Sequence, residues 1–302
     1  MVTTLVGIAN HGARIGYEGE TRKKLISPNH RSTYENHTVI DQAITKEVEC
    51  GRVKPLGAQL PDNYVCSPLG LTPKRTNSAQ IGWRTIFDLS APPQNSVNDG
   101  IPKEYGSISY ETLTDAINLV IHQGKGCIML KRDLKSAFRH IPTSPRDYWL
   151  LIFEWKGHYY VDLCLPFGLR TAPRIFNLFS EAIHWILETL YGWKLTHYLD
   201  DFLAVFPPSD EDTIQSHSLN FDTVLSQMGF TKAADKDMEG TSVIHLGFVI
   251  DSTAMEVTLP IHKANRAQEA IKYLLSSKST TSKRLDELLG FLSHCCQVMP
   301  LG

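Results

Sequence analysis

The 302-residue sequence lacks a long apolar run. No apolar stretch is as long as a membrane-spanning helix, which needs about 18 residues. Its first residues, MVTTLVGIANHGARIG, have neither the charged start nor the apolar centre of a secretory signal peptide. No CxxC pair occurs among the six cysteines, and Cys295 and Cys296 are adjacent, which argues against a cysteine zinc clip and indicates free thiols. These absences predict an intracellular protein, of the cytoplasm or nucleus, with no membrane partner.

A net charge of one sign is also lacking, since 30 Lys and Arg stand against 32 Asp and Glu and leave a net charge of −2. The charges are nevertheless segregated along the chain. Basic residues gather in residues 51–87 and 262–284, and acidic residues concentrate in residues 201–256. Segregation of this kind lets a nearly neutral protein present a basic groove, so nucleic acid stays among the candidate partners.

Predicted helices and strands alternate irregularly along the chain. Residues 1–36 are polar and are expected to form an irregular arm. Apolar periodicity and turn residues predict strands at 81–89, 127–134, 149–155, 159–165, 196–199, 202–206 and 242–250. They predict helices at 41–50, 111–123, from Thr171 onward, 209–228, 262–276 and 282–297. This mixture favours an α+β fold with a mixed or antiparallel sheet backed by helices.

Two carboxylates stand side by side in the segment THYLDDFLAVFP, residues 196–207, between two short apolar strands. A single Asp has a structural explanation, because Asp tolerates the positive φ that tight hairpin turns need. A pair exceeds that need and suits a hard divalent cation such as Mg²⁺. Asp133 ends the apolar strand in IMLKRDL and supplies a third carboxylate for a two-metal site. Ordinary turn aspartates and a helix cap are the alternative.

Five segments, in order, resemble the reverse transcriptase family. YLDD (198–201) resembles its YxDD box, RDLKSAF (132–138) its strand-end Asp box, and LPFGLRTAPRIFN (165–177) its nucleotide- and template-contacting segment. SPLGLTPKR and GWRTIFDLS resemble the fingers strands, and HLGF (245–248) resembles the primer-grip hairpin. The resemblance covers residues 61–302. Within the family, the segments LSAPPQNSVNDGIP, AFRHIP and HYLDDFL look most like retrotransposon enzymes of the DIRS type, or of a related LTR-retroelement branch.

The resemblance implies a right-hand polymerase core of the α+β class. Residues 1–60 would form an N-terminal arm and short helix, residues 61–256 the interleaved fingers and palm, and residues 257–302 a partial helical thumb. The thumb's packing stripe would comprise Leu285, Leu288, Leu289 and Leu292. The implied activity is that of an RNA-directed DNA polymerase, a nucleotidyltransferase that extends a primer on an RNA or DNA template with dNTPs and two Mg²⁺ ions, or Mn²⁺. Such a chain would belong to a retroelement polyprotein, with RNase H or recombinase regions missing after Gly302.

The resemblance also implies a role for each matching residue. Asp133, Asp200 and Asp201 would hold the metal ions, with Asp201 less direct. Lys236 would protonate pyrophosphate, although Lys232 is a rival and a plain solvated lysine is the simpler alternative. The nucleotide site would comprise Lys74, Arg84, Leu134, Ser136, Ala137, Phe138, Phe167 and Gly168. The residues that contact primer and template would be Tyr198, Leu199, Arg170, Pro173, Leu246 and Gly247.

Phe138 is implied to lie under the sugar and to exclude a 2′-hydroxyl, and a core Phe is the alternative. Lys74 and Arg84 would grip the triphosphate, since Arg makes forked phosphate contacts and Lys acts as a point charge. Arg75 is an alternative to Lys74, and a solvated strand-edge cation is the simpler reading. Gly168 would let the backbone approach the nucleotide.

The sequence departs from the family pattern at three positions. Phe167 stands where some relatives have Gln, so a polar contact made there is not expected. Ser90 stands where many relatives have Arg, and Ser136 where some have Asp. Side-chain roles at these positions are therefore not carried over from the family.

Two other functions share parts of this pattern. A catalytically inactive nucleic-acid-binding remnant, or a captured copy of such an enzyme, would retain the fold. The presence of all three carboxylates Asp133, Asp200 and Asp201 (the triad) and of Phe138 argues against it. An RNA-dependent RNA polymerase also carries an Asp pair on a palm hairpin. Phe138 and the PFG loop argue against that alternative.

Overall fold

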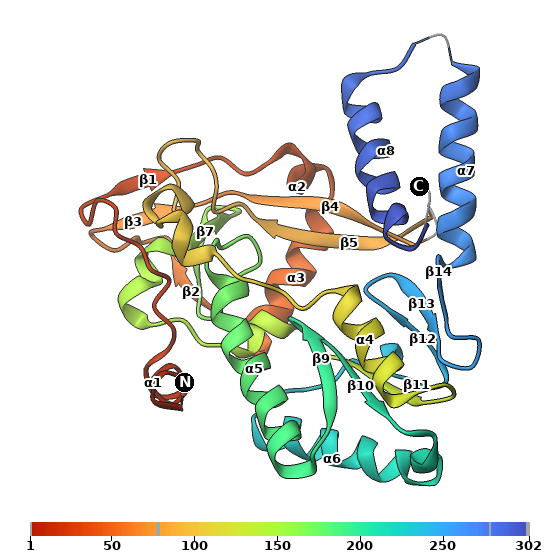
Figure 1. The fold of residues 1–302 in the computed structure, drawn as a ribbon. Helices are drawn as coiled ribbons and strands as arrows, with labels where there is room; N and C mark the ends of the chain where they lie inside the picture. The colour runs from red at the N-terminus through yellow and green to blue at the C-terminus, as the bar shows by residue number, and fades with distance from the viewer. Residues whose placement is uncertain (1, 77–78, 278, 300–302) are drawn as a thin grey trace. The chain divides into compact units, whose positions relative to one another are not determined.

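The computed structural model describes residues 2–76, 79–277 and 279–299, with side chains over this range except at 75–76 and 79–81 (Figure 1). The chain forms two compact units that are both discontinuous in sequence. The first comprises Met1–Ser109 with Lys135–Ile183, and the second Tyr110–Leu134 with His184–Gly302. Helix α5 (Ala172–Tyr191) contributes residues to both units. Among the described helices, none combines the length and apolar character that a membrane crossing requires.

The first unit contains a five-stranded mixed sheet in the order β1-β3-β7-β8-β2. Strands β1, β3 and β7 run parallel, and the other pairings are antiparallel. The strands are β1 (Lys24–Ile26), β2 (Val53–Gly57), β3 (Tyr64–Cys66), β7 (Ile152–Trp155) and β8 (His158–Asp162). A separate hairpin pairs β4 (Leu69–Thr76) with β5 (Ala79–Phe87). The helices are α1 (Val2–His11), α2 (Arg31–Glu35) and α3 (His37–Glu49), and the 3₁₀ turns are η1 (Asn98–Gly100), η2 (Lys103–Gly106), η3 (Ala137–His140) and η4 (Pro145–Leu150).

The expectation that residues 1–36 are irregular is wrong for half of this segment. It contains α1, β1 and α2, and Ile15 is fully buried. The order comes from distant partners, because β1 pairs with β3 and Arg14 Nε lies 2.9 Å from Asp147 Oδ2. Local sequence pattern does not reveal such long-range contacts.

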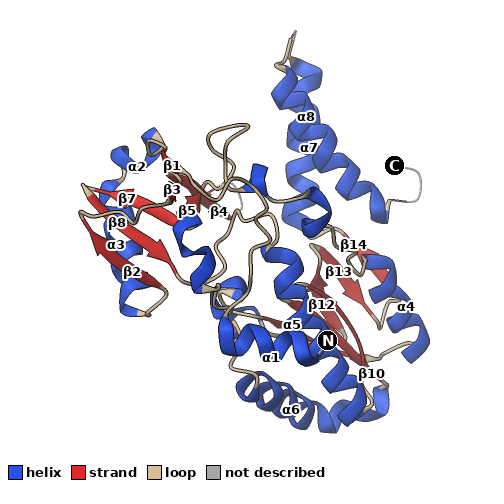
Figure 2. Ribbon diagram, turned by 90° about the vertical axis from the view of Figure 1, so that its left-hand side faces the viewer, coloured by secondary structure: helices blue, strands red, loops and turns tan. Residues whose placement is uncertain are grey.

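The second unit contains two antiparallel sheets. The four-stranded sheet has the order β11-β6-β10-β9, and the three-stranded sheet the order β12-β13-β14 (Figure 2). The strands are β6 (Ile128–Asp133), β9 (Lys194–Tyr198), β10 (Asp201–Phe206), β11 (Met238–Gly240), β12 (Ser242–His245), β13 (Phe248–Asp251) and β14 (Glu256–Thr258). The helices are α4 (Leu113–Gln123), α6 (Ile214–Gln227), α7 (Ile261–Ser276) and α8 (Ser282–Cys295), with 3₁₀ turns η5 (Pro208–Thr213), η6 (Ala234–Lys236) and η7 (Cys296–Val298).

Helix α4 begins and ends at residues that favour its boundaries. Thr112 and Asp115 form a reciprocal capping box, and Gly124 follows the last turn with a φ of 90°. The apolar face of the helix packs in one core with residues of both sheets: Met129, Leu203, Val205, Val243, Phe248 and Ile250. Burial of this face fixes α4 against the sheet strands that carry the acidic residues.

Glu111, immediately before α4, is tied to strand β9. Its Oε2 accepts hydrogen bonds from the backbone N–H of His197 and, at 3.0 Å, from Thr196 Oγ1. Burial alone would raise the pKa of Glu111, but the bonds from His197 and Thr196 and the proximity of the His197 ring lower this pKa to about 2. The carboxylate therefore stays charged at neutral pH.

Most predicted elements are confirmed, but several boundaries differ and one predicted strand is a hairpin. The expected strand 149–155 begins with the 3₁₀ turn η4, and only Ile152–Trp155 is extended. Ser209 does not start α6, because it lies within η5 and its hydroxyl donates to Asp210 Oδ1. The expected strand 242–250 is instead the β12–β13 hairpin, since Leu246 and Gly247 have φ of 48° and 85° and reverse the chain.

The predicted leucine stripe of helix α8 is only partly buried. Leu288 is buried and Leu292 is half-buried, whereas Leu285 and Leu289 are 40% and 54% exposed. Helix α7 packs against α8, where Arg266 lies over the ring of Phe291. The stripe prediction is wrong for Leu285 and Leu289, because one neighbouring helix cannot cover the whole apolar face. The boundaries of the arm, fingers, palm and thumb stay predictions.

Candidate active site

The two adjacent aspartates lie at the tip of the β9–β10 hairpin. Asp201 is the first residue of β10 and pairs with Tyr198, so Leu199 and Asp200 form a two-residue turn. Leu199 has the positive φ, 53°, and neither aspartate does. The alternative explanation, in which an Asp is present to supply the positive φ of the turn, therefore does not apply to either aspartate. Such a conformation costs a non-glycine residue free energy, and the hairpin pairing holds it in place.

Asp133 reaches the same place from the neighbouring strand. Strands β6 and β10 pair antiparallel with Asp133 opposite Asp201, so the end of β6 meets the start of β10. The backbone N–H of Leu134 donates to the carbonyl oxygen of Asp200 at 2.9 Å, which extends the pairing into the turn. The three predicted carboxylates thus come from adjoining backbone positions at one edge of the sheet. Asp133 is 8% exposed and Asp200 is half-buried.

A buried arginine fixes strand β6 from its other face. Arg132 is 1% exposed, and its Nη2 donates to Ser218 Oγ at 2.6 Å and to Glu239. Its Nε lies 3.5 Å from Asp237 Oδ2. These contacts join β6 to α6 and β11, so the strand end that presents Asp133 is held on both sides.

The two rival lysines occupy different places. Lys236 Nζ donates to Asp133 Oδ1 at 2.9 Å. Burial acts to lower the pKa of Lys236, but this bond and the negative charges of Asp133, Asp200 and Asp201 together raise it. Lys232 Nζ instead contacts Asp222 at 2.7 Å and Asp237 at 3.1 Å, which lie outside the triad. The geometry brings Lys236 to the triad.

Asp201 has two further neighbours that the sequence reasoning missed. Lys131 Nζ lies 3.4 Å from Asp201 Oδ2, and His245 Nδ1 lies 3.6 Å from Asp201 Oδ1. Lys131 precedes Asp133 by two residues, so strand alternation places both on one face, and this signal was readable. His245 comes from β12, and only the tertiary structure brings it to Asp201. Within the described part of the chain, Asp201 Oδ1 and both ring nitrogens of His245 are buried without a hydrogen-bond partner.

The electrostatics of the triad favour a cation. Burial, and then the negative charge of Asp133, raise the pKa of Asp200 to about 6. Asp201 Oδ1 is a buried acceptor without a donor in the described residues. Three carboxylates face the two lysines Lys131 and Lys236, so an excess of negative charge remains among hard oxygen ligands, the type that Mg²⁺ prefers. The chemistry of these carboxylate donors therefore suits a divalent cation.

Tyr198, the first residue of the YLDD segment, is braced by an aromatic neighbour. Its ring stacks on that of Tyr110, with centroids 4.5 Å apart and planes inclined by 28°. Tyr198 remains 38% exposed. Tyr110, which lies before α4, was not among the predicted residues because nothing in the local sequence links it to the hairpin.

The hairpin predicted as a primer grip is held by the two C-terminal helices. Lys263 Nζ of α7 donates to the carbonyl oxygen of Gly247 at 2.9 Å and lies 3.2 Å from His294 Nε2 of α8. The ring of Phe248 also contacts the ring of His294, with centroids 4.5 Å apart. Gly247 and Phe248 are thus fixed by contacts to α7 and α8 within the second unit, and Leu246 packs against the core that α4 shares with the sheets.

The predicted nucleotide residues after Leu134 belong to the first unit. Phe138 lies in η3, and its ring contacts those of Phe167 and Phe176 at centroid distances of 5.0 and 5.4 Å. Ala137 is buried, and Ser136 is exposed with a φ of 56°. Phe138 is half-buried and Phe167 is 53% exposed, so this aromatic group keeps an open side.

The structure gives a reason, not evident from the sequence, why residue 168 is a glycine. Its φ is 103°, and a Cβ at this position would lie 2.6 Å from the carbonyl oxygen of Phe87. Asn98 Nδ2 donates to the Gly168 carbonyl at 2.8 Å, and Asn98 Oδ1 accepts from the backbone N–H of Arg170. The side chain of Arg170 in turn donates to the carbonyl of Ile101. Pro173, also predicted to meet primer or template, lies half-buried in the first turn of α5.

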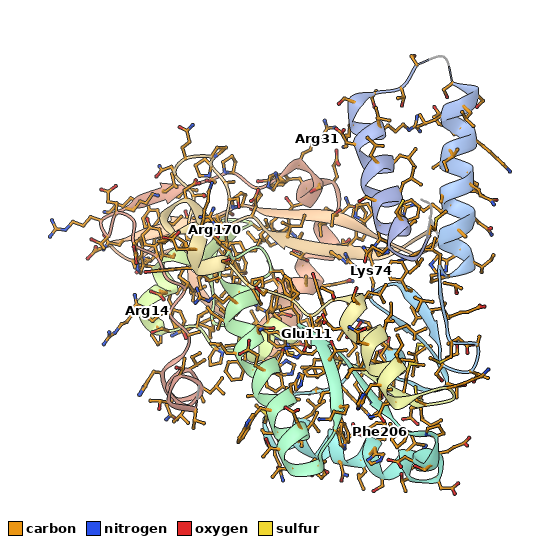
Figure 3. The ribbon with its side chains drawn as sticks, viewed as in Figure 1. Arg14, Arg31, Lys74, Glu111, Arg170 and Phe206 are labelled. Atoms are coloured by element: carbon orange, nitrogen blue, oxygen red, sulfur yellow. The ribbon has the colours of Figure 1, made fainter. Side chains whose placement is uncertain are left out.

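The two basic residues predicted to bind the triphosphate lie on the β4–β5 hairpin. Arg84 pairs opposite Thr72, and Lys74, which is labelled in Figure 3, pairs opposite Gly82, two residues further along. Residues two apart on a strand point to the same face, so Lys74 and Arg84 share one face of the hairpin. Both side chains are exposed. The side chain of Arg75, the alternative to Lys74, lies outside the described residues.

Comparison with other proteins identifies sequence relatives over part of the chain. The chain is similar to Protein P of duck hepatitis B virus (isolate white Shanghai duck S31), with 27% identity over 135 residues, which cover 44% of this chain and 17% of that protein. It is also similar to the retrovirus-related Pol polyprotein from transposon gypsy of Drosophila melanogaster, with 28% identity over 137 residues, 44% of this chain and 12% of that protein. The chain therefore matches less than a fifth of the length of these relatives.

Solved structures extend the similarity to nearly the whole chain. The foamy viral protease-reverse transcriptase in complex with dsDNA has a TM-score of 0.65 and 20% identity, and covers 93% of this chain and 52% of that chain. The same type of protein in complex with an RNA/DNA hybrid has a TM-score of 0.64 and 21% identity, and covers 91% of this chain and 33% of that chain. The α+β reverse transcriptase polymerase fold is therefore confirmed.

A family model described as reverse transcriptase (RNA-dependent DNA polymerase) matches residues 84–274. This match contains the hairpin aspartates, Asp133 and the residues around Phe138. Members of this family are RNA-directed DNA polymerases, a class of nucleotidyltransferase that typically uses divalent metals. Because the model matches more than half of the 302 residues, the chain belongs to the reverse transcriptase family.

Proposed function

We propose that this chain extends a primer with dNTPs on an RNA or DNA template. The observation that carries the proposal is the pairing of Asp133 with Asp201 beside Asp200, with Lys236 bonded to Asp133. Two divalent ions held by these carboxylates would supply charge neutralisation for the primer 3′-hydroxyl and the triphosphate. The foamy viral relatives in complex with dsDNA and with an RNA/DNA hybrid support duplex nucleic acid as the partner.

The chain's own residues have separate tasks in this proposal. Asp133 and Asp200 would hold the ions, and Asp201, which also faces Lys131 and His245, would act less directly. Lys236 donates a proton to the pyrophosphate that leaves. Its position on Asp133 supports this role, whereas Lys232 is engaged by Asp222 and Asp237.

The first unit supplies substrate recognition in this proposal. Lys74 and Arg84 bind the triphosphate from one exposed face of the β4–β5 hairpin. Phe138, braced by Phe167 and Phe176, excludes the 2′-hydroxyl of a ribonucleotide. A ring rejects an added hydroxyl because it offers neither space nor a hydrogen bond.

The experiment that tests the proposal compares Asp200→Asn with the wild-type chain. The variant should lower the rate of primer extension about 10³-fold or more, because a main electrostatic stabiliser of the transition state is lost. Asp62→Asn, the same chemical change at an exposed loop residue, is the matched control. Unchanged extension by Asp200→Asn contradicts the mechanism. A wild-type chain that binds primer-template but never extends it supports the non-catalytic binding protein instead.

We also propose that the chain comes from a retrotransposon of the DIRS type. The similarity to the transposon gypsy polyprotein supports a retroelement origin, and the segments LSAPPQNSVNDGIP and HYLDDFL support the branch. The genomic sequence that follows the codon for Gly302 tests this assignment. A recombinase reading frame supports the DIRS type, and an integrase reading frame contradicts it.

A further inference from the structure

A cluster of two histidines and one glutamate lies outside the carboxylate triad. Glu111 precedes α4, His184 lies on α5 and His197 lies on β9, and all three belong to the second unit (Figure 3, which labels Glu111). One ligand atom from each residue lies within 4.8 Å of the others. The proposed polymerase chemistry uses none of these three side chains.

The separations inside the cluster suit a four-coordinate metal ion. His184 Nδ1 lies 2.9 Å from His197 Nδ1, and Glu111 Oε2 lies 3.3 Å from His197 Nδ1 and 4.0 Å from His184 Nδ1. A tetrahedron with metal–ligand distances of about 2.0–2.1 Å has edges of about 3.3–3.4 Å. The three observed separations span this edge length, so small side-chain rotations would place all three atoms around one ion.

A hydrogen-bond network satisfies the same three atoms less well. His197 Nδ1 faces both His184 Nδ1 and Glu111 Oε2, but an imidazole nitrogen carries at most one proton. That proton cannot serve both neighbours with good geometry. A metal ion accepts a lone pair from each of the three atoms at once.

The surroundings orient the ligands as metal sites require. Glu111 Oε2 is already held by Thr196 Oγ1 and by the backbone N–H of His197, and such secondary bonds fix a ligating carboxylate. His197 is 8% exposed, and the His184 side chain is 20% exposed. A partly open His184 leaves a route for an ion to enter, whereas buried His197 is shielded from competing water.

We propose that Glu111, His184 and His197 bind one Zn²⁺ ion, with the fourth coordination position open to water. Two imidazoles and a carboxylate form a donor set that zinc favours over Mg²⁺. The ion would join three segments, namely the entry to α4, helix α5 and strand β9. Strand β9 leads directly into the Tyr198–Asp201 turn, so the site would brace the base of that hairpin.

The experiment measures zinc binding by the full chain, freed of metal with a chelator and kept in excess Mg²⁺. Magnesium fills hard oxygen sites and competes poorly for imidazole. The wild-type chain should retain one equivalent of Zn²⁺ against a chromophoric chelator, and zinc should raise its melting temperature. Co²⁺ in place of zinc should show the intense visible absorption of a four-coordinate site. The result does not depend on polymerase activity.

Three variants locate the ion. His184→Ala should weaken zinc binding about 100-fold or more, since loss of a supporting group alone costs about 10–100-fold. Glu111→Gln keeps a side-chain oxygen for the bonds from Thr196 and His197, and should weaken zinc binding at least about 10-fold. His122→Ala removes an exposed histidine of α4 and should leave the affinity unchanged.

Three outcomes would overturn the proposal. The first is a wild-type chain that binds no zinc, which would make the cluster a hydrogen-bonded network only. The second is unchanged affinity in both His184→Ala and Glu111→Gln, with zinc seated elsewhere. The third is loss of zinc in Asp200→Asn while the cluster variants keep it, because the ion would then occupy the carboxylate triad. If His184→Ala does not fold, Glu111→Gln decides alone.

Discussion

The two lysines near the triad allow a direct test of the proton-donor assignment. In Lys236→Ala the side chain that bonds Asp133 is lost, whereas Lys232→Ala removes a lysine of equal charge that bonds Asp222 and Asp237. Loss of a positioned general acid costs about 10²–10⁴-fold in rate. Lys236→Ala should therefore lower kcat by this factor, which corresponds to about 3–5 kcal/mol of transition-state stabilisation.

The effects on stability should run in the opposite order. The Lys236 side chain is 55% exposed, so its pair with Asp133 contributes less than about 1 kcal/mol. The Lys232 side chain is 27% exposed and makes two charged contacts, at 2.7 and 3.1 Å. Its loss should lower the free energy of unfolding by about 1–3 kcal/mol, while kcat stays close to the wild-type value.

The assay is single-nucleotide extension of a primer-template at saturating dNTP, with melting temperatures measured on the same preparations. Lys236→Arg separates charge from proton donation, because a guanidinium keeps the pair with Asp133 but does not release a proton at neutral pH. This variant should stay close to Lys236→Ala in kcat. The assignment is refuted if Lys236→Arg extends as fast as wild type, or if Lys232→Ala is the slower alanine variant.

Three further predictions follow from the first unit. Phe138→Val should narrow the ratio of kcat/KM for dCTP over CTP, and a joint loss of dCTP activity and melting temperature at an unchanged ratio would make the ring ordinary packing. Arg84→Ala should raise the apparent KM for dNTP by the equivalent of about 1.5–3 kcal/mol, and a fall in duplex affinity without a change in KM would place Arg84 on the template path. Gly168→Ala should lower the melting temperature more than Gly157→Ala. Both glycines have positive φ, but only a Cβ at residue 168 would meet the Phe87 carbonyl oxygen, at 2.6 Å. Equal decreases in melting temperature would show that this contact does not explain the glycine.

Much of the fold was readable from sequence because local signals agreed with it. Helix α4 has a capping box at Thr112 and a glycine after its last turn, and its period-3.6 apolar face is the buried one. Helices α7 and α8 also lie close to their predicted ranges. The residue pattern alone predicted the β12–β13 hairpin as one strand, since its two-residue turn has no Asn-Gly or Asp-Gly signal, whereas the resemblance of HLGF to the primer-grip hairpin implied the turn.

The candidate site was predictable in part for the same reason. Asp133, Asp200 and Asp201 stand at the ends of short apolar runs, where a strand stops and its last side chain is presented. The contacts that tune them were not predictable. His245 comes from β12 of the three-stranded sheet, Tyr110 precedes α4, and each meets the hairpin only through tertiary packing.

The sequence by itself determined the chemistry that this chain offers: three carboxylates at strand ends, an aromatic after the first, and cations on a fingers-like hairpin. These features depend on residue type and on short sequence spacing, and the local backbone geometry of a strand or helix then sets where such side chains lie. Only the tertiary structure decided which lysine serves Asp133, since Lys232 and Lys236 are four residues apart and equally basic in isolation. Only it showed that the left-handed residue of the turn is Leu199, and that Glu111, His184 and His197 converge. Such choices depend on contacts between residues far apart in the chain, whose free energies exist only once the core has closed around them.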